Sequence, residues 1–156
     1  MGSLLSCWRI VQERYSKEAF SGEGARIYGG RWNSAGDAAV YAAGSRALAV
    51  LEMLVHLDGP QLLSSFLLHE AELAESLVTE LLMGDLPRDW RDDPAPASTQ
   101  VIGDAWIRSG ASAVLRVPSV LIPQEHNYLL NPRHAEFNRV RVSGPEKFAF
   151  DARLKG

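Results

Sequence analysis

The chain is short of cysteine, of basic charge and of long apolar runs, and each shortage argues against a class of protein. Cys7 is the single cysteine among 156 residues, so no disulfide forms within the chain, which suits a reducing compartment. The formal net charge is −3, whereas a nucleic-acid-binding domain usually carries a basic face. No apolar run reaches the roughly 18 residues that a membrane-spanning helix needs. We therefore expect a cytoplasmic globular protein that contacts neither membrane nor nucleic acid directly.

Several enzyme motifs are missing as well. The four histidines and the isolated cysteine show no zinc-type spacing, so we expect no metal site. The glycine-rich stretch 21–30 matches neither the Walker pattern nor G-x-G-x-x-G. Ser119 lacks the G-x-S-x-G elbow of serine hydrolases. These absences argue against metal-dependent, Walker-type and serine hydrolase chemistry.

The hydrophobic pattern predicts one mixed α+β domain with strands towards both ends of the chain. Strands are expected over 7–12, 38–43, 64–73, 112–123 with a break at Pro118, 139–143 and 147–154. Helices are expected over 46–58 from a Ser45 cap, over 99–110 with an end at Gly110, and over 131–138 from an Asn131 cap. Residues 13–38 are expected to be mostly loop with a short helix near 16–20, 76–82 a strand or a helical turn, and 84–99 a surface loop. Residues 1–6 are expected to be a frayed terminus.

Glu52 and His56 are the polar exceptions in the stretch "ALAVLEMLVHL" (47–57) of the predicted helix, whose other nine residues are apolar. Their i, i+4 spacing places them on one face. On a helical wheel Glu52 borders an apolar stripe made of Leu48, Leu51 and Val55. A helix that is apolar on nearly every side is normally buried. The Glu52 carboxylate is then either a structural group, paired with an arginine or hydrogen-bonded to the His56 ring, or a rigid group that lines a cleft.

Tyr41 and Arg31 each allow two interpretations. Tyr41 stands among small and apolar residues, either as a core aromatic or with room beside its ring for a flat heteroaromatic ligand. Arg31 follows Gly29 and Gly30, where the backbone bends tightly and a ligand can approach. Its guanidinium is a fixed fork of donors suited to phosphate. The arginine is therefore either a solvated turn residue or a clamp for an anion.

Ser119 and Asn127 are candidates for hydrogen bonds to a substrate. Ser119 lies between Pro118 and Val120 in an apolar run, which fixes its direction and favours a hydrogen-bonding role over a nucleophilic one. The stretch "HNYLLNP" (126–132) adds Asn127. Asn131 is expected to be a helix cap first and a ligand contact second.

Four ordered stretches of this chain resemble the RES domain, which is named for its arginine, glutamate and serine. They are "WRI" (8–10), "GGRWNSAG" (29–36), "AVYAAGSRALAVLEMLVHL" (39–57) and "VPSVLIPQEHNYLLNP" (118–132). The resemblance spans nearly the whole chain, and the motifs together are far more specific than any one alone. Ser34 and Ala35 depart from the proline-rich sequence expected after "RWN", in a loop away from the key positions.

The resemblance implies a fold similar to that of the diphtheria-type ADP-ribosyltransferase toxins, a split β core with helices around an NAD cleft. RES proteins resemble the toxins of bacterial toxin–antitoxin pairs, in which an Xre-like helical DNA-binding antitoxin covers that cleft. The implied activity consumes NAD as a substrate, with release of nicotinamide. ADP-ribose then passes to water, to phosphate or to a protein acceptor.

Carried over by position, the resemblance implies a site formed by Arg31, Tyr41, Glu52 and Ser119. Glu52 is expected to stabilise the oxocarbenium-like ribose and to bond a ribose hydroxyl. Tyr41 is expected to stack on nicotinamide, Arg31 to clamp the pyrophosphate or ribose, and Ser119 to bond the substrate or orient the glutamate. The rival hypothesis is a non-catalytic nucleotide- or partner-binding module with a structural Arg31–Glu52 ion pair. An RNA-directed toxin is disfavoured by the acidic balance.

Overall fold

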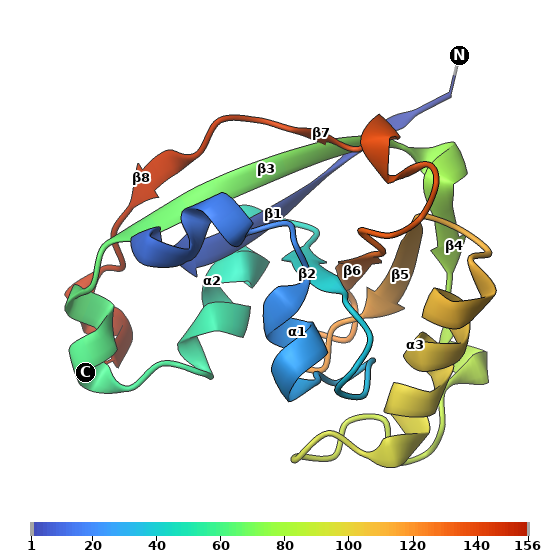
Figure 1. Ribbon diagram of the computed structural model, residues 1–156. Helices are drawn as coiled ribbons and strands as arrows, with labels where there is room; N and C mark the ends of the chain where they lie inside the picture. Colours follow the sequence, from blue (N-terminus) through green and yellow to red (C-terminus); the bar gives the residue numbers. More distant parts are fainter. Residues whose placement is uncertain (1, 156) are drawn as a thin grey trace.

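The computed structural model describes residues 2–155, in which one curled sheet is flanked by a few helices (Figure 1). The strands are β1 (Leu4–Gln12), β2 (Val40–Ala43), β3 (Phe66–Ala74), β4 (Val78–Glu80), β5 (Val114–Pro118), β6 (His126–Leu130), β7 (Arg141–Val142) and β8 (Glu146–Phe148). The α-helices are α1 (Glu23–Tyr28), α2 (Arg46–Leu54) and α3 (Ala97–Ser109). Short 3-10 helices lie at Glu13–Glu18, Gly59–Leu63, Glu75–Leu77, Met83–Asp85, Phe137–Arg139 and Ala152–Lys155. Within residues 2–155 no helix combines the length and apolarity that a membrane crossing requires.

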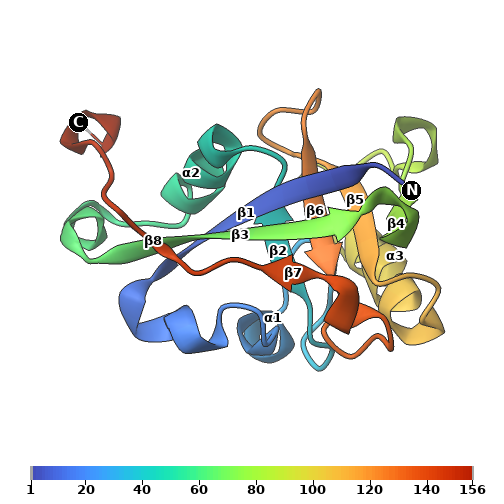
Figure 2. The ribbon, with the colours of Figure 1, turned by 90° about the horizontal axis from the view of Figure 1, so that it is seen from above.

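The sheet is nearly divided in two, as the expected split β core requires. Its strands follow the order β4-β5-β6-β2-β1-β3-β7, with β8 also paired to β3. The two halves meet at β1 and β2, whose pairing consists of the single register pair Trp8↔Ala43. Both views show β1 and β3 crossing steeply over β2, β6 and β5 (Figures 1 and 2). The mixed α+β architecture expected from the sequence is confirmed.

Helix α2 covers the sheet where its two halves meet. Its buried side chains, Leu48, Ala49 and Leu54, pack in one cluster with Ile10 of β1 and Ala43 of β2. Phe66 and Phe150 belong to the same cluster and pack edge to face with ring centroids 4.8 Å apart. Aromatic pairs prefer this arrangement. The helix that carries Glu52 is therefore held against both halves of the sheet.

Helix α3 covers β5 and β6 through a second cluster rich in tryptophan. Its buried members are Trp32, Trp90, Trp106, Leu115, Val117 and Leu129. The helix comes so close to the segment after α1 that a Cβ on Gly103 would lie 1.6 Å from the carbonyl oxygen of Trp32. Only a residue without a side chain fits there. Glycine thus lets α3 lie directly against the backbone that follows Arg31.

Local capping signals are confirmed. The Ser45 hydroxyl accepts a hydrogen bond from the Leu48 N–H at 3.0 Å, as an N-cap does. Gly110 ends α3 in the left-handed conformation with φ 63°. Strand β5 ends at Pro118, the break that the sequence predicted.

Two predicted helices differ from the structure, and two elements were missed. The helix expected over 131–138 is a series of turns that leads into the short 3-10 helix at Phe137–Arg139. The Asn131 side chain accepts from the Arg133 N–H in a local turn, and no α-helix begins there. Helix α2 ends at Leu54 rather than Asp58. The residues after Leu54 form tighter turns that lead into the 3-10 helix at Gly59–Leu63. Helix α1 lies in a segment expected to be mostly loop, and β6 was not predicted.

Two further expectations, one about the N-terminal residues and one about the burial of helix α2, were also wrong. Residues 4–6 are not frayed, since they pair with 72–74 of β3, whereas residue 1 lies outside the described residues. The stripe of Leu48, Leu51 and Val55 is not a buried face, because Leu51 is 40% and Val55 56% exposed. Helix α2 therefore has a buried side and an exposed apolar side, and Glu52 lies at their border.

Candidate active site

Strand alternation gathers three of the candidate side chains on one face of the sheet. Leu129 pairs with Tyr41, and Asn127 pairs with both Ala43 and Val117. Residues two apart on a strand, and residues directly opposite each other, point to the same face. Tyr41 and Asn127 therefore share the face that α2 and α3 cover. Ser119, two residues beyond Val117, follows the end of β5 on that side.

The Glu52 carboxylate is aimed by two neutral donors. Its Oε1 accepts from the Ser119 hydroxyl and from the Asn127 amide, each at 2.8 Å. The side chain is half-buried at the border of α2. Among residues 2–155 no donor reaches the other carboxylate oxygen, Oε2, and no cation pairs with the charge. The glutamate therefore offers one oxygen and its negative charge to a ligand.

Ser119 is fixed by its own turn. The residue is 0% exposed, and its hydroxyl oxygen accepts from the backbone N–H groups of Leu121 at 3.1 Å and Ile122 at 3.2 Å. Because these donors occupy the lone pairs, the hydroxyl proton is left to point at Glu52. The structure thus places Ser119 as an orienting group for the glutamate.

Asn127 presents an unused acceptor beside the same carboxylate. Its amide nitrogen is bonded to Glu52, while its Oδ1 is buried and has no hydrogen-bond partner among the described residues. A buried polar atom without a partner costs free energy unless something else satisfies it. A hydroxyl group on a ligand at Glu52 would supply the missing donor.

Arg31 does not pair with Glu52. Its Nη1 donates to the carbonyl oxygens of Trp90 at 3.0 Å and Asp92 at 2.7 Å, both in the segment before α3. Within residues 2–155 no ion pair joins Arg31 to the glutamate, so the structural pair of the rival hypothesis is absent. The remaining donors of the guanidinium are left for an anion.

The Tyr41 hydroxyl makes two hydrogen bonds within the protein. It donates to the Asn33 Oδ1 at 2.6 Å and accepts from the Trp32 N–H at 3.0 Å. Burial is the main cause that raises the pKa of this phenol well above its ordinary value, so the group stays protonated. The hydroxyl also closes over Gly30, where a Cβ would lie 2.6 Å from it. Tyr41 therefore braces the turn that carries Arg31 and leaves its ring for a ligand.

The sequence reasoning missed two residues of this region. Arg9 of β1 donates from Nη1 to the Tyr41 carbonyl at 3.0 Å, and burial lowers the pKa of its guanidinium. Its Nε is buried and has no hydrogen-bond partner in the described part of the chain. Asn33 donates to the carbonyls of Ala25 and Asp37 while it holds Tyr41. An arginine inside an apolar strand was the available signal for Arg9, but nothing in the local sequence marked Asn33.

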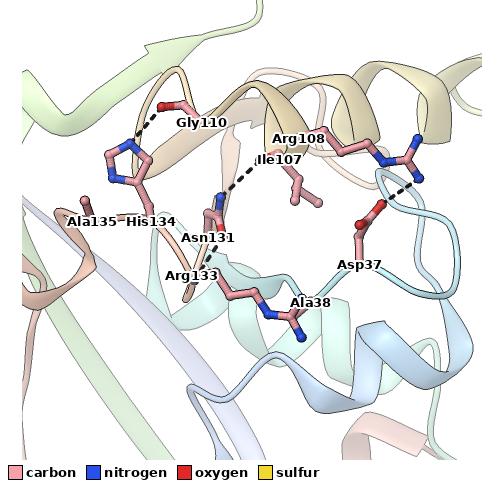
Figure 3. A pocket seen from close by; sticks show the side chains of 9 residues that line it. All are labelled: Asp37, Ala38, Ile107, Arg108, Gly110, Asn131, Arg133, His134 and Ala135. Atoms are coloured by element: carbon pink, nitrogen blue, oxygen red, sulfur yellow. Dashed lines mark hydrogen bonds and ion pairs between the residues drawn. The ribbon is translucent and has the colours of Figure 1, made fainter.

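Figure 3 shows a separate hollow of about 440 Å³ whose lining includes Asn131. Asn131 follows the C-terminal end of β6, whereas Glu52 contacts Asn127 near the start of that strand. The polar groups of the hollow largely satisfy one another. Arg108 pairs with Asp37 at 3.0 Å, and His134 uses one ring nitrogen on the Gly110 carbonyl and the other on the Glu136 N–H. It contains none of the four residues implied by the resemblance. We therefore centre the candidate site on Glu52 rather than on this hollow.

The described residues contain no group of three or more His, Cys, Asp or Glu side chains placed to hold a metal ion. The chemistry available at Glu52 is that of a carboxylate fixed by two neutral donors, with no cation paired to it among residues 2–155. Such a group stabilises positive charge that develops on a bound molecule.

Comparison with known proteins finds similar sequences and a similar fold. The chain is 49% identical over 149 residues to "Toxin Res" of Yersinia enterocolitica, covering 95% of this chain and 98% of that protein. It is 40% identical over 154 residues to "Prs ADP-ribosylating toxin" of Sphingobium sp., covering 96% of each. Its fold matches a chain of the Mycobacterium tuberculosis MbcT–MbcA toxin–antitoxin complex with a TM-score of 0.78 at 19% identity, over 99% of this chain and 88% of that one. The RES domain model matches residues 6–151, and the chain therefore belongs to the RES domain family.

Proposed function

We propose that this protein is the toxin of a bacterial toxin–antitoxin pair and that it cleaves the bond between nicotinamide and ribose in NAD. The observation that carries the proposal is the Glu52 carboxylate, held through Oε1 by Ser119 and Asn127 with Oε2 unoccupied by any donor of residues 2–155. The name of the Sphingobium relative, an ADP-ribosylating toxin, supports the use of NAD. The complex that contains the similar fold supports an antitoxin partner.

The reaction needs what the site offers. The bond from ribose C1′ to the nicotinamide nitrogen breaks, and its electron pair leaves with nicotinamide, which departs as a neutral molecule. Positive charge builds on the ribose, as in other glycosidic cleavages, and Glu52 stabilises that charge. A lone pair on water, phosphate or a protein side chain then forms the new bond to C1′, and the acceptor loses its proton where it carries one.

The other candidate residues have binding roles in this proposal. The Asn127 Oδ1 accepts from a ribose hydroxyl, because it is buried and unpartnered. The free donors of Arg31 hold the pyrophosphate, and the Tyr41 ring stacks on nicotinamide. Ser119 acts on the substrate only through the glutamate that it orients. No general acid is needed, since the leaving group is neutral.

Purified protein incubated with NAD is expected to release free nicotinamide, measured by chromatography. The assay is run with water alone, with added phosphate and with cell extract, so that each class of acceptor is present in turn. Labelled NAD then identifies the product that carries ADP-ribose. Intact NAD in all three conditions at high enzyme excess would reject the enzymatic proposal.

An Xre-like antitoxin is the proposed partner, and the exposed apolar side of α2 suits it. Leu51 and Val55 flank Glu52 and are 40% and 56% exposed. Exposed apolar groups beside a site are typical of protein interfaces. A partner seated there also covers the carboxylate, so binding and inhibition coincide.

If a neighbouring reading frame encodes a small helix-turn-helix protein, we expect that protein to suppress NAD cleavage when it is mixed with the toxin. Leu51→Asp and Val55→Asp are expected to weaken that suppression at least about tenfold, because a charge is placed in an apolar contact. Leu63→Asp is the matched control, since Leu63 is 89% exposed and lies beyond α2. Equal suppression of all three variants would place the antitoxin elsewhere.

A further inference from the structure

Residues of helix α3 contact the backbone of successive residues in the turn that carries Arg31. The Gln100 amide donates to the Gly30 carbonyl at 3.1 Å, and the Thr99 hydroxyl donates to the Arg31 carbonyl at 2.6 Å. Further along, Gly103 packs on the Trp32 carbonyl. The helix positions 99, 100, 103 and 104 lie on one face, so a single face of α3 lies along the turn.

The last of these contacts is made by Asp104. Its carboxylate accepts from the Ser34 N–H at 2.8 Å and from the Ser34 hydroxyl at 2.6 Å. The turn is thus fixed on both sides of Arg31 by a regular helix rather than by loop residues. Groups mounted on a helix or strand are held more precisely than groups on loops.

Thr99 has a second contact that distinguishes it from its neighbours. Its side chain is fully buried, and its hydroxyl also reaches the Pro96 carbonyl at 3.1 Å. Pro96 ends the same segment whose Trp90 and Asp92 carbonyls accept from the Arg31 guanidinium. The hydroxyl has a single proton, and the shorter contact assigns it to the Arg31 carbonyl. Thr99 therefore ties the backbone of Arg31 to the first turn of α3, directly after the segment that holds its side chain.

We infer that Thr99 is a positioning residue for Arg31, and that the segment 90–96 together with the first turn of α3 forms the holder that aims the guanidinium at an anionic ligand. This inference rests on the proposed function for the identity of the ligand, NAD. The holder itself is defined by hydrogen bonds that do not involve NAD, so it has a test of its own.

The kinetic test compares Thr99→Val, which removes the hydroxyl and keeps the shape, with Thr99→Ser, which keeps the hydroxyl. Thr99→Val is expected to raise KM for NAD about tenfold with kcat within about twofold, the pattern of lost substrate binding. Thr99→Ser is expected to match the parent protein. Thr79→Val is the control, because Thr79 donates to Ser112 at a remote edge of the sheet.

A double variant separates positioning from general stability. In an Arg31→Ala background, Thr99→Val is expected to add no further rise in KM, since there is no guanidinium left to aim. Equal and additive effects with and without Arg31 would overturn the inference. If Thr99→Val does not fold, Gln100→Ala takes its place with a smaller rise in KM of the same kind, and its additivity with Arg31→Ala decides in the same way.

The second readout needs no NAD. The side-chain Nε–H signal of Arg31 in an NMR spectrum, assigned by its loss in Arg31→Lys, is expected to show a rigid group in the parent protein, Thr99→Ser and Thr79→Val. It is expected to show a mobile group in Thr99→Val. If the protein does not cleave NAD, the kinetic test shows no activity for any variant. The Arg31 Nε–H signal still shows whether Thr99 holds the guanidinium. A rigid Arg31 in folded Thr99→Val would reject the holder.

Discussion

Replacing Glu52 with glutamine is expected to slow nicotinamide release about 10³-fold and to leave the fold intact, because removing one preorganised stabilising group at a transition state costs roughly 10²–10³ in kcat. Glutamine has the same shape, and its amide oxygen still accepts from Ser119 and Asn127 as the carboxylate does at 2.8 Å. The substitution therefore removes the negative charge without removing the hydrogen bonds.

Two measurements check this prediction. Initial rates of nicotinamide release give the loss of activity, and urea unfolding followed by circular dichroism gives the stability, which is expected to change by less than about 1 kcal/mol. Glu18→Gln is the matched control, since Glu18 is exposed and its side chain makes no hydrogen bond within residues 2–155. A Glu52→Gln protein that is folded and fully active would show that the carboxylate is not the stabilising group.

Replacing Gly103 with alanine is expected to destabilise the protein by at least about 3 kcal/mol, the upper range for forcing extra volume into a packed interior. The new Cβ would lie 1.6 Å from the Trp32 carbonyl oxygen and 3.1 Å from the Trp32 Cβ. Helix α3 and the turn that carries Arg31 are hydrogen-bonded to each other, so neither can move away without breaking the bonds to Arg31 and Ser34.

The midpoint of urea unfolding checks this expectation. Gly24→Ala is the control, because Gly24 lies in α1 and a Cβ there meets nothing within 4 Å. Alanine in a helix is favoured over glycine by about 1 kcal/mol, so the control is expected to be at least as stable as the parent protein. An unchanged midpoint in Gly103→Ala would mean that α3 does not rest on the Trp32 carbonyl.

Sequence reasoning succeeded where the determining contacts are local. The Ser45 cap and the Gly110 end of α3 involve residues three or four positions apart, so the sequence itself carries the signal. It failed at Asn131, because the same side chain caps a helix or a simple turn and the choice depends on packing. Alternation predicted several strands but missed β6, and with it the sheet order that places Asn127 opposite Ala43.

The candidate site shows the same division. The position of Glu52 in an apolar helix made it a candidate from the sequence alone. Its hydrogen bonds to Ser119 and Asn127 could not be predicted, because these partners are 67 and 75 residues away in the chain. Arg31 was expected to be free for a ligand, yet its Nη1 is bound to backbone carbonyls 59 and 61 residues away. Main-chain acceptors leave no mark in a sequence, since every residue has one.

The groups that hold Glu52, a hydroxyl and an amide, carry no net charge. Dissolved salt screens the attraction between separated charges, but it acts weakly on short hydrogen bonds from buried neutral donors. The orientation of the carboxylate is therefore insensitive to ionic strength, whereas the electrostatic attraction of Arg31 for an anion weakens as the salt concentration rises. In the proposed reaction, salt governs the capture of the dinucleotide and leaves the geometry at the breaking bond unchanged.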